Sequence, residues 1–171
     1  FGDRRKLLEI STPTIKNASW IEDAYIQGDQ RHFYVPCPSC DHRQKLVWAS
    51  VIWDEDQPET AKYACNGCGV MWGDGERIAA IRRGEWRGAR EFRGHASYHL
   101  NELYSCFRKL GDIAQSFLEK KRSGDLQTFV NVSLAETWEE SGDSVDQDML
   151  EERAEDWGDR WPDQVITVVA G

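Results

Sequence analysis

The sequence predicts an α+β fold in which a small β module with two cysteine-bearing turns is flanked by helices. Three observations carry this prediction. Short apolar segments of strand length alternate with turn residues between positions 31 and 75, and two Cys-x-x-Cys pairs lie in that region. An apolar stripe at helical spacing follows from Leu110. The composition, 40% hydrophobic and 30% charged over 171 residues, is that of a globular chain with a buried core.

The first elements are predicted from short patterns. Residues 6–14, KLLEISTPT, are expected to form a buried strand, since an apolar run is followed by Ser, Thr and Pro. A helix is expected to begin at Ser19, with Glu22 three residues later completing a capping box, and to end at Gly28. Short strands are then expected at Phe33–Val35, Leu46–Trp48, Lys62–Ala64 and Val70–Trp72, with a polar loop over 54–59.

The second half is predicted to be mainly helical. A short helix is expected near Glu76–Arg83. The clearest helix starts at Leu110 and ends near Ser123–Gly124, with one apolar face formed by Leu110, Ile113, Ala114, Phe117 and Leu118. A second helix is expected over Leu126–Leu134, with Leu126, Phe129, Val130 and Leu134 facing inward.

Two further elements are expected near the C-terminus, a helix around Met149–Trp157 and a buried strand over 164–171. A domain seldom begins and ends on buried strands, because lone strands leave backbone groups unpaired. The sequence is therefore expected to be a piece of a longer polypeptide.

The net charge of −9 is unevenly distributed. Residues 135–171 contain twelve acidic residues and two arginines, which gives −10 for this segment and +1 for the first 134 residues. The acidity argues against a broad basic face for tight non-specific DNA binding, although it allows a local basic strip. No apolar run approaches the ~20 residues of a membrane span. The N-terminus lacks the apolar stretch of a signal peptide, so a reducing compartment is expected.

The cysteines form the strongest chemical pattern. Cys37 and Cys40 are separated by 24 residues from the second pair, Cys65 and Cys68. Each pair lies at a turn that is rich in Pro or Gly, where two sulfur atoms can converge on one ion. Four thiolates complete the tetrahedron of a Zn²⁺ ion and leave no open position, so the pattern predicts a structural zinc site of the zinc-ribbon type.

Other interpretations of the cysteines fit the pattern less well. A thioredoxin-type redox pair requires Cys-x-x-Cys at the start of a helix, and two disulfides suit a secreted chain. Metal removal is expected to unfold residues 33–72 and to spare the helices of 110–134. His42 is interpreted as a surface residue, His95 and His99 as structural residues of a strand, and Cys106 as a small apolar residue outside the cluster.

No complete active site is present in the sequence. It contains no Gly-x-x-x-x-Gly-Lys-Ser/Thr loop, no Gly-x-Ser-x-Gly elbow and no His-Glu-x-x-His motif. One basic strip, residues 77–94, interleaves arginines with Trp86 and Phe92, a combination suited to phosphate contacts. The other interpretation, which the sequence slightly favours, is a solvated helix end and loop that happen to be basic. The candidate DNA-binding residues are Arg82, Arg83, Arg87, Arg90 and Arg93, with Arg77 at the start of the strip.

Several segments, taken in order, resemble one protein family. RHFYVPCPSC, YACNGCG, GEWRG, HLNELYS and LQTFVNVSLAETWEE are similar to the large terminase subunit of tailed bacteriophages, the lambda-type GpA family. The resemblance covers nearly the whole chain. It implies an N-terminal ATPase that moves DNA into a capsid and a C-terminal RNase H-like nuclease that cuts the DNA concatemer.

The resemblance also implies a division of the chain. Residues 1–30 would end the α/β ATPase core, 31–75 would form the zinc ribbon, 76–135 a mixed strand and helix region, and 136–171 an acidic linker to the first nuclease strand. An ATP-coupling role is implied for Ser11, Thr12, Pro13 and Thr14. ATP and Mg²⁺ would bind only to the full-length protein, whose Walker and nuclease residues are not in this sequence.

The resemblance implies as partners double-stranded viral DNA, the small terminase subunit and the portal protein, in the host cytoplasm and without a membrane. Whether the segment belongs to an enzyme depends on the whole protein. The alternative hypothesis is a stand-alone zinc-ribbon adaptor that binds nucleic acid or a protein partner.

Overall fold

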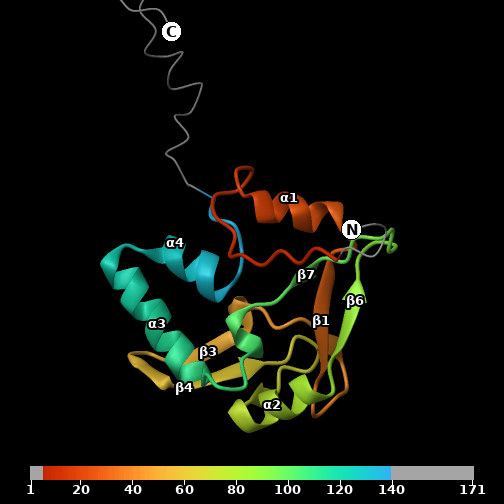
Figure 1. Ribbon diagram of the computed structural model, residues 1–171. Coiled ribbons are helices and arrows are strands. Elements are labelled where there is room, and N and C mark those ends of the chain that lie inside the picture. The colour runs from red at the N-terminus through yellow and green to blue at the C-terminus, as the bar shows by residue number, and fades with distance from the viewer. Residues whose placement is uncertain (1–5, 140–171) are drawn as a thin grey trace, which may run out of the picture. The chain divides into compact units, whose positions relative to one another are not determined.

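The computed structural model describes residues 6–139, so the helix expected around Met149–Trp157 and the strand expected over 164–171 lie outside the described residues. Within this range helices and strands are mixed, which confirms the α+β prediction (Figure 1). The elements are α1 Trp20–Gln27, β1 Arg31–Pro36, β2 Arg43–Gln44, a 3-10 turn Trp48–Ser50, β3 Val51–Asp54, β4 Gln57–Ala64, β5 Met71–Trp72, α2 Asp74–Arg82, β6 Glu85–Gly88, β7 Tyr98–His99, a 3-10 turn Glu102–Tyr104, α3 Leu110–Ser123, α4 Leu126–Thr128 and a π-helical turn Phe129–Ser133.

The strands form two small sheets. In the first, β1 pairs antiparallel with β2 at its C-terminal end and with β6 along its N-terminal half, while β7 pairs with β1 in parallel. In the second, β4 lies between β3 and β5, and both pairings are antiparallel. The last residues of β1 and β4 each lead into a cysteine turn, so the two sheets present the two cysteine pairs.

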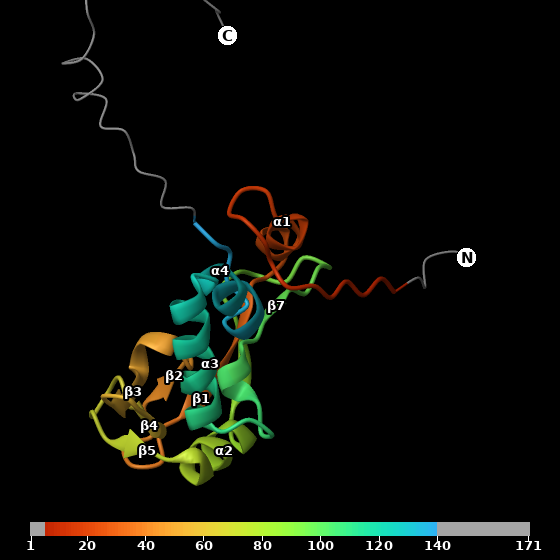
Figure 2. The same cartoon turned by 90° about the vertical axis from the view of Figure 1, so that its left-hand side faces the viewer.

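Helix α3 packs across the β3–β4 hairpin and closes the core (Figures 1 and 2). Its fully buried face consists of Leu110, Ile113 and Ala114, as the apolar spacing predicts. Burying a side chain of the size of Leu or Ile contributes about 2 kcal/mol. The buried residues of both sheets and of α3 form a single cluster, so the cysteine-bearing strands and the helical part share one core.

The helices agree with the sequence prediction in position. Helix α2 and helix α3 are confirmed, and α3 ends at Gly124, whose positive φ of 73° is accessible to glycine without strain. Residues 126–133 are helical, with a π turn in place of a regular second half. No helix among residues 6–139 is both long and apolar enough to cross a membrane.

Helix α1 is confirmed, but its predicted capping box is wrong. The Ser19 hydroxyl accepts a hydrogen bond from the Thr14 N–H at 3.2 Å instead of capping the helix. The Glu22 carboxylate accepts from the Asn17 N–H at 3.2 Å. The chain before α1 turns back toward the helix, and this turn uses the side-chain oxygens that a capping box would require.

The buried strand expected over residues 6–14 does not form among the described residues. Leu7, Leu8 and Ile10 are 73%, 81% and 84% exposed. Within the described range, the β-type pairing near this segment is a single parallel bridge between Ile15 and Trp138. A strand needs a neighbour along its backbone, and in the described range Thr14 alone among residues 6–14 bonds a segment distant in sequence, through its carbonyl.

The strand expected at Leu46–Trp48 is also wrong, because side chains bond its backbone. The hydroxyl of Tyr104 accepts from the Leu46 N–H at 2.8 Å, and that of Tyr63 accepts from the Val47 N–H at 3.2 Å. Both tyrosines come from outside the segment. Their hydroxyls take the place of a neighbouring strand, so the segment is apolar, with Leu46 buried and Val47 and Trp48 half-buried, without being part of a sheet.

Besides the two-residue β2, two longer strands were not expected from the sequence. β3 and the first part of β4 occupy much of the region predicted as a polar loop, and they form a hairpin whose tight turn contains Asp56 with φ +57°. β6 lies in the basic strip, and all four of its residues are exposed. Neither strand has the apolar alternation that marks a half-buried strand in the sequence.

Three ring-bearing side chains lie together where α1, β1 and β7 meet. The Tyr25 hydroxyl lies 3.0 Å from His32 Nε2, and His99 Nε2 donates to the Ala135 carbonyl at 3.0 Å. The rings of His32 and His99 are 5.2 Å apart. Burial, followed by the positive charge of Lys45 and by His99, lowers the pKa of His32 to about 4. Burial is also the main reason why the pKa of His99 is lowered.

We expect acid to destabilise the fold through His32. An unfolded-chain histidine has a pKa of about 6.5, so between pH 6.5 and pH 4 the unfolded state binds the proton that the folded state does not. Stability from this group is therefore present above pH 6.5 and is lost as the pH falls. The melting temperature of His32→Phe should fall less than that of the unmodified protein between about pH 7 and about pH 5.

The exposed His95 provides the matched control, because His95→Gln should keep the unmodified pH dependence. Loss of metal in acid affects both variants alike. Equal acid sensitivity in the His32 and His95 variants would contradict the assignment.

Candidate metal centre

The two cysteine turns have the same backbone structure. In the first, the Cys37 N–H donates to the His42 carbonyl at 2.9 Å, and the Asp41 N–H donates to the Cys37 carbonyl at 3.0 Å. In the second, Cys65 makes the equivalent bonds with Val70 at 2.9 Å and Gly69 at 2.8 Å. The fifth residue of each turn has positive φ, 56° at Asp41 and 72° at Gly69. Each turn therefore bends its strand back sharply and places two sulfur atoms on one side.

The turns bring four sulfur atoms together. The Sγ atoms of Cys37, Cys40, Cys65 and Cys68 all lie within 4.8 Å of one another. The distances across the turns are 3.8 Å from Cys37 to Cys68 and 3.9 Å from Cys40 to Cys65. A regular tetrahedron with Zn–S bonds of about 2.3 Å has edges of about 3.8 Å. The cluster is therefore the right size to hold a metal ion such as Zn²⁺.

Backbone N–H groups point at the buried sulfurs. The Ser39 N–H lies 3.4 Å from Cys37 Sγ, and the Gly67 N–H lies 3.3 Å from Cys65 Sγ. Burial opposes ionisation of Cys65, but the N–H groups of Cys68 and Gly67 and the neighbouring thiols lower its pKa to about 6.

The pKa of Cys40 shifts in the opposite direction, to about 12. The His42 N–H lowers it, and the neighbouring thiols together with burial raise it more. One thiol of the cluster thus ionises easily and another with difficulty, because negative charges accumulate in one place. A divalent cation removes this conflict.

Gln44 joins the two turns and is a site residue that the sequence analysis missed. It is 4% exposed, and its Nε2 donates to Cys65 Sγ at 3.4 Å. Its Oε1 accepts from the Asn66 N–H at 2.8 Å, within the second turn. The side chain of a β2 residue thus orients the other cysteine turn, as residues that contact metal ligands commonly do. No local pattern in HRQKL signals this contact.

The geometry disfavours the other interpretations of the cysteines. Sulfur separations of 3.8 Å and 3.9 Å are far longer than the about 2.05 Å of a disulfide bond. Both turns connect strands, whereas a redox pair of the thioredoxin type begins a helix. His42 is exposed on the first turn, and the exposed Cys106 is not among the four clustered cysteines.

The structure separates the arginines of the basic strip. Arg77 is completely buried, and its guanidinium donates to the carbonyls of Leu103, Ser105 and Arg108 and to Asp74. It is a structural residue of the core and does not contact solvent. The five candidate DNA-binding arginines are all exposed, namely Arg82, Arg83, Arg87, Arg90 and Arg93.

Acidic residues pair with several of these arginines. Arg83 lies 3.0 Å from Asp41, and Arg87 lies 2.5 Å from Glu85. Arg93 pairs with Glu91 at 3.4 Å, where both side chains are strongly exposed. Exposed pairs of this kind contribute about 0–1 kcal/mol, so an incoming phosphate can replace them.

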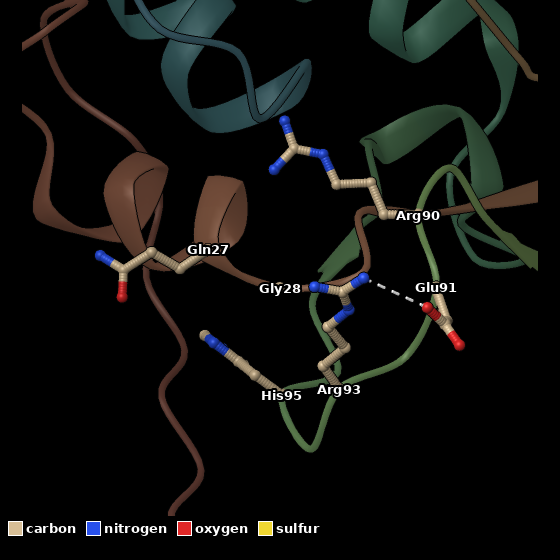
Figure 3. A pocket seen from close by; sticks show the side chains of 6 residues that line it. All are labelled: Gln27, Gly28, Arg90, Glu91, Arg93 and His95. Carbon is tan, nitrogen blue, oxygen red and sulfur yellow. Dashed lines mark hydrogen bonds and ion pairs between the residues drawn. The ribbon is translucent and has the colours of Figure 1, made fainter.

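The strip also forms one wall of a surface pocket of about 500 Å³ beside the end of α1 (Figure 3). Figure 3 shows the Arg93 guanidinium beside Gly28, with Arg90 and His95 on the same loop. Arg90 Nη1 donates to the Ile26 carbonyl at 2.9 Å, which fixes the loop to the helix. The side chains that line the pocket are charged or polar, and two of them are arginines. None of the four cysteines is among its lining residues.

The candidate ATP-coupling residues, 11–14, are distant in sequence from both the four cysteines and the arginines of the basic strip. Among residues 11–14, Pro13 is buried, and Ser11, Thr12 and Thr14 are exposed. The Ser11 hydroxyl donates to the Thr12 carbonyl at 3.0 Å. The Thr14 carbonyl accepts from the Asn131 side chain and from the Trp138 N–H, each at 2.8 Å. Thr14 therefore contacts the last described part of the chain.

Comparison with known proteins gives two consecutive matches. A model of the phage terminase large subunit gpA ATPase domain matches residues 1–86, and a model of the terminase large subunit gpA endonuclease domain matches residues 95–171. The large terminase subunit of Enterobacteria phage P21 is 29% identical over 207 residues, and that of Escherichia phage lambda is 27% identical over 203 residues. Each comparison covers 99% of this chain but 32% of the relative. No solved structure matches the chain.

The cluster is expected to bind one zinc ion per chain. Replacing one ligand, as in Cys40→Ser, should abolish stoichiometric zinc and lower the melting temperature by roughly 10 °C or more. Because α3 shares the core with the cysteine-bearing strands, metal loss should also destabilise α3, rather than residues 33–72 alone. Elemental analysis and thermal melting measure the two effects.

Cys106→Ser is the matched control and should retain full zinc content. Zinc content that is unchanged in Cys40→Ser, or lost equally in Cys106→Ser, would show that the cluster is not the metal site.

Proposed function

Because this chain belongs to the GpA family of phage terminase large subunits, we propose that it is the central region of a viral DNA-packaging enzyme. In its full-length form this enzyme hydrolyses ATP to move DNA into the capsid and cuts concatemeric DNA. The chain spans 32% of the length of the curated relatives that it matches, so these activities are proposed for the whole protein.

One observation carries the proposal. An ATPase-domain match ends at residue 86 and an endonuclease-domain match begins at residue 95, and the residues on both sides contribute to a single buried core. Tyr104, from the second match, accepts a hydrogen bond from Leu46 in the first. Buried Arg77 donates to carbonyls of residues 103–108. These contacts support the proposal that the segment is a folded joint between two catalytic domains.

Zinc is proposed as a structural cofactor of this joint. Cys37, Cys40, Cys65 and Cys68 would hold it, and four thiolates leave no position for a substrate or a reactive water. The ion would neutralise the thiolates and fix the two sheets to each other. Its role is to brace the fold, and it takes no part in ATP hydrolysis or DNA cutting.

The remaining assignments follow from family membership. Residues 1–30 are proposed to complete the ATPase core, with Ser11, Thr12, Pro13 and Thr14 sensing nucleotide state, and 136–171 to lead into the nuclease. ATP and Mg²⁺ would act in the full-length protein. Double-stranded viral DNA is the proposed substrate, with the small terminase subunit and the portal protein as partners in the host cytoplasm.

The exposed arginines of the strip are proposed to contact the DNA backbone. Arg90 and Arg93 lie on the loop that lines the pocket beside α1, together with His95. The weak ion pair of Arg93 and the partly used donors of Arg90 leave N–H groups for phosphate oxygens. Contacts of this type would position duplex DNA without selecting a sequence.

The function is tested with the full-length protein that contains this chain. It should hydrolyse ATP in the presence of DNA and cut double-stranded DNA, whereas the 171-residue chain alone should do neither. Absence of both activities from the full-length protein would contradict the proposal and favour the alternative of a zinc-ribbon adaptor. Turnover by the isolated chain would contradict the view that its site is structural.

The DNA contact is tested by charge removal. The double substitution Arg90→Ala with Arg93→Ala should weaken DNA binding and reduce the slope of log affinity against log salt by about 0.9 for each phosphate that is no longer neutralised. Arg122→Ala, at the end of α3, is the matched control and should leave both values unchanged. An unchanged salt slope in the double variant would show that the pocket arginines do not bind DNA.

A further inference from the structure

Two segments that are more than 100 residues apart in the sequence are hydrogen-bonded to each other. The Trp138 N–H donates to the Thr14 carbonyl at 2.8 Å, and the Lys16 N–H donates to the Trp138 carbonyl at 2.9 Å. These bonds form the parallel bridge between Ile15 and Trp138. The end of the described chain lies beside the segment that precedes α1, as Figure 1 shows. We refer to residues 14–16 together with 136–139 as the clasp.

Side chains support the clasp on both sides. The Thr137 hydroxyl donates to the Glu22 carboxylate on α1 at 3.2 Å. Lys16 forms an ion pair with Glu139. These interactions are partly exposed, so each contributes little alone. They connect the clasp to α1 and join its two segments to each other.

Asn131 closes the clasp from inside. It is 8% exposed, and its Nδ2 group donates two hydrogen bonds of 2.8 Å each, to the carbonyls of Thr14 and Glu136. One amide group therefore joins the segment before α1 to the segment after the π turn. Asn131 belongs to LQTFVNVSLAETWEE, and the metal centre does not explain this motif. Removing the amide would leave two carbonyls without their donor.

The clasp joins the parts of the chain that match two different catalytic domains. Thr14 and Lys16 fall in the ATPase-domain match, and Asn131 and Trp138 fall in the endonuclease-domain match. Thr14 is also the last of the four residues proposed to sense nucleotide state. A displacement of the Thr14 carbonyl must break or carry with it the bonds from Asn131 and Trp138. The hydrogen bonds of Asn131 and Trp138 join the two segments directly, and the cysteine turns take no part in them.

We propose that Asn131 is a positioning residue that couples the segment at Thr14, in the ATPase-domain match, to the segment at Trp138, in the endonuclease-domain match. The inference rests on the proposed function, since it requires both activities in one protein. The amide holds the two carbonyls in register, so that the nucleotide state sensed at residues 11–14 determines the position of Trp138. Asn131 contacts neither ATP nor DNA in this role.

The test uses the full-length protein and measures three rates: ATP hydrolysis, DNA cutting with ATP, and DNA cutting without ATP. In Asn131→Ala the ratio of cutting with and without ATP should fall about tenfold, the order of effect expected from the removal of two hydrogen bonds. ATP hydrolysis and nucleotide-free cutting should stay near the unmodified rates. Asn131→Asp keeps the side-chain volume but lacks the donors, so it should reproduce the loss.

Asn101 provides the matched control. It has the same exposed fraction of 8%, and its Nδ2 donates to the Leu46 carbonyl at 2.9 Å inside the core and away from the clasp. Asn101→Ala should affect stability while leaving the cutting ratio unchanged. Thr137→Val, which removes only the bond to Glu22, should fold normally and lower the ratio by a smaller factor.

The outcomes separate the inference from the proposed function. If the unmodified protein neither hydrolyses ATP nor cuts DNA, the proposed function is wrong. If it does both, the inference is overturned by any of three results: cutting that is independent of ATP, a ratio unchanged in both Asn131 variants, or an equal loss of all three rates in the Asn131 and Asn101 variants. Hydrogen exchange gives a second readout, since Asn131→Ala should expose the Lys16 and Trp138 amides and Asn101→Ala should not.

Discussion

Four thiol groups within 4.8 Å of one another are the constraint on which the fold depends. Negative charge cannot accumulate there without a cation, and neutral thiols form weak hydrogen bonds, so the cluster by itself offers little to hold the strands together. The turns at Cys37 and Cys65 terminate strands of two different sheets. An interaction that fixes the sulfurs therefore fixes one sheet against the other. Gln44, which follows the first turn, adds hydrogen bonds to Cys65 and Asn66 of the second turn.

A second set of polar groups joins the cysteine-bearing part to the helical part. Arg77 is fully buried and donates to three carbonyls of the loop that precedes α3. Tyr104 connects that loop region to Leu46 and to Phe33. Buried polar groups of this kind are costly unless each is satisfied, so they require one arrangement of the loop. Arg77 and Leu46 fall in the ATPase-domain match, and Tyr104 falls in the endonuclease-domain match. Buried residues from both matches form one core, so the core is not divided where the matches are.

The segments outside this core have a different character. Residues 6–14 have exposed apolar side chains, and the chain returns to them at Trp138. The cysteine cluster and the clasp are thus separate features: the cluster lies between the two sheets, and the clasp joins the two ends of the described fold. This separation supports the proposal that the cysteine cluster has a structural role that is distinct from the proposed packaging activity.

The sequence by itself determined the cysteine turns, α3 and the family, because each depends on local spacing or on an ordered series of motifs. Two Cys-x-x-Cys turns need only Pro or Gly nearby, and a helix face repeats every three to four residues. Tertiary structure decided the rest. Leu46–Trp48 is apolar yet forms no strand, because hydroxyls from Tyr63 and Tyr104 bond its backbone. Arginine is usually a surface residue. Arg77 can be buried because carbonyl groups 26 to 31 residues later in the chain accept hydrogen bonds from its guanidinium. Asn131 bonds a carbonyl 117 residues away. Such partners follow from the path of the whole chain, and no local period encodes them.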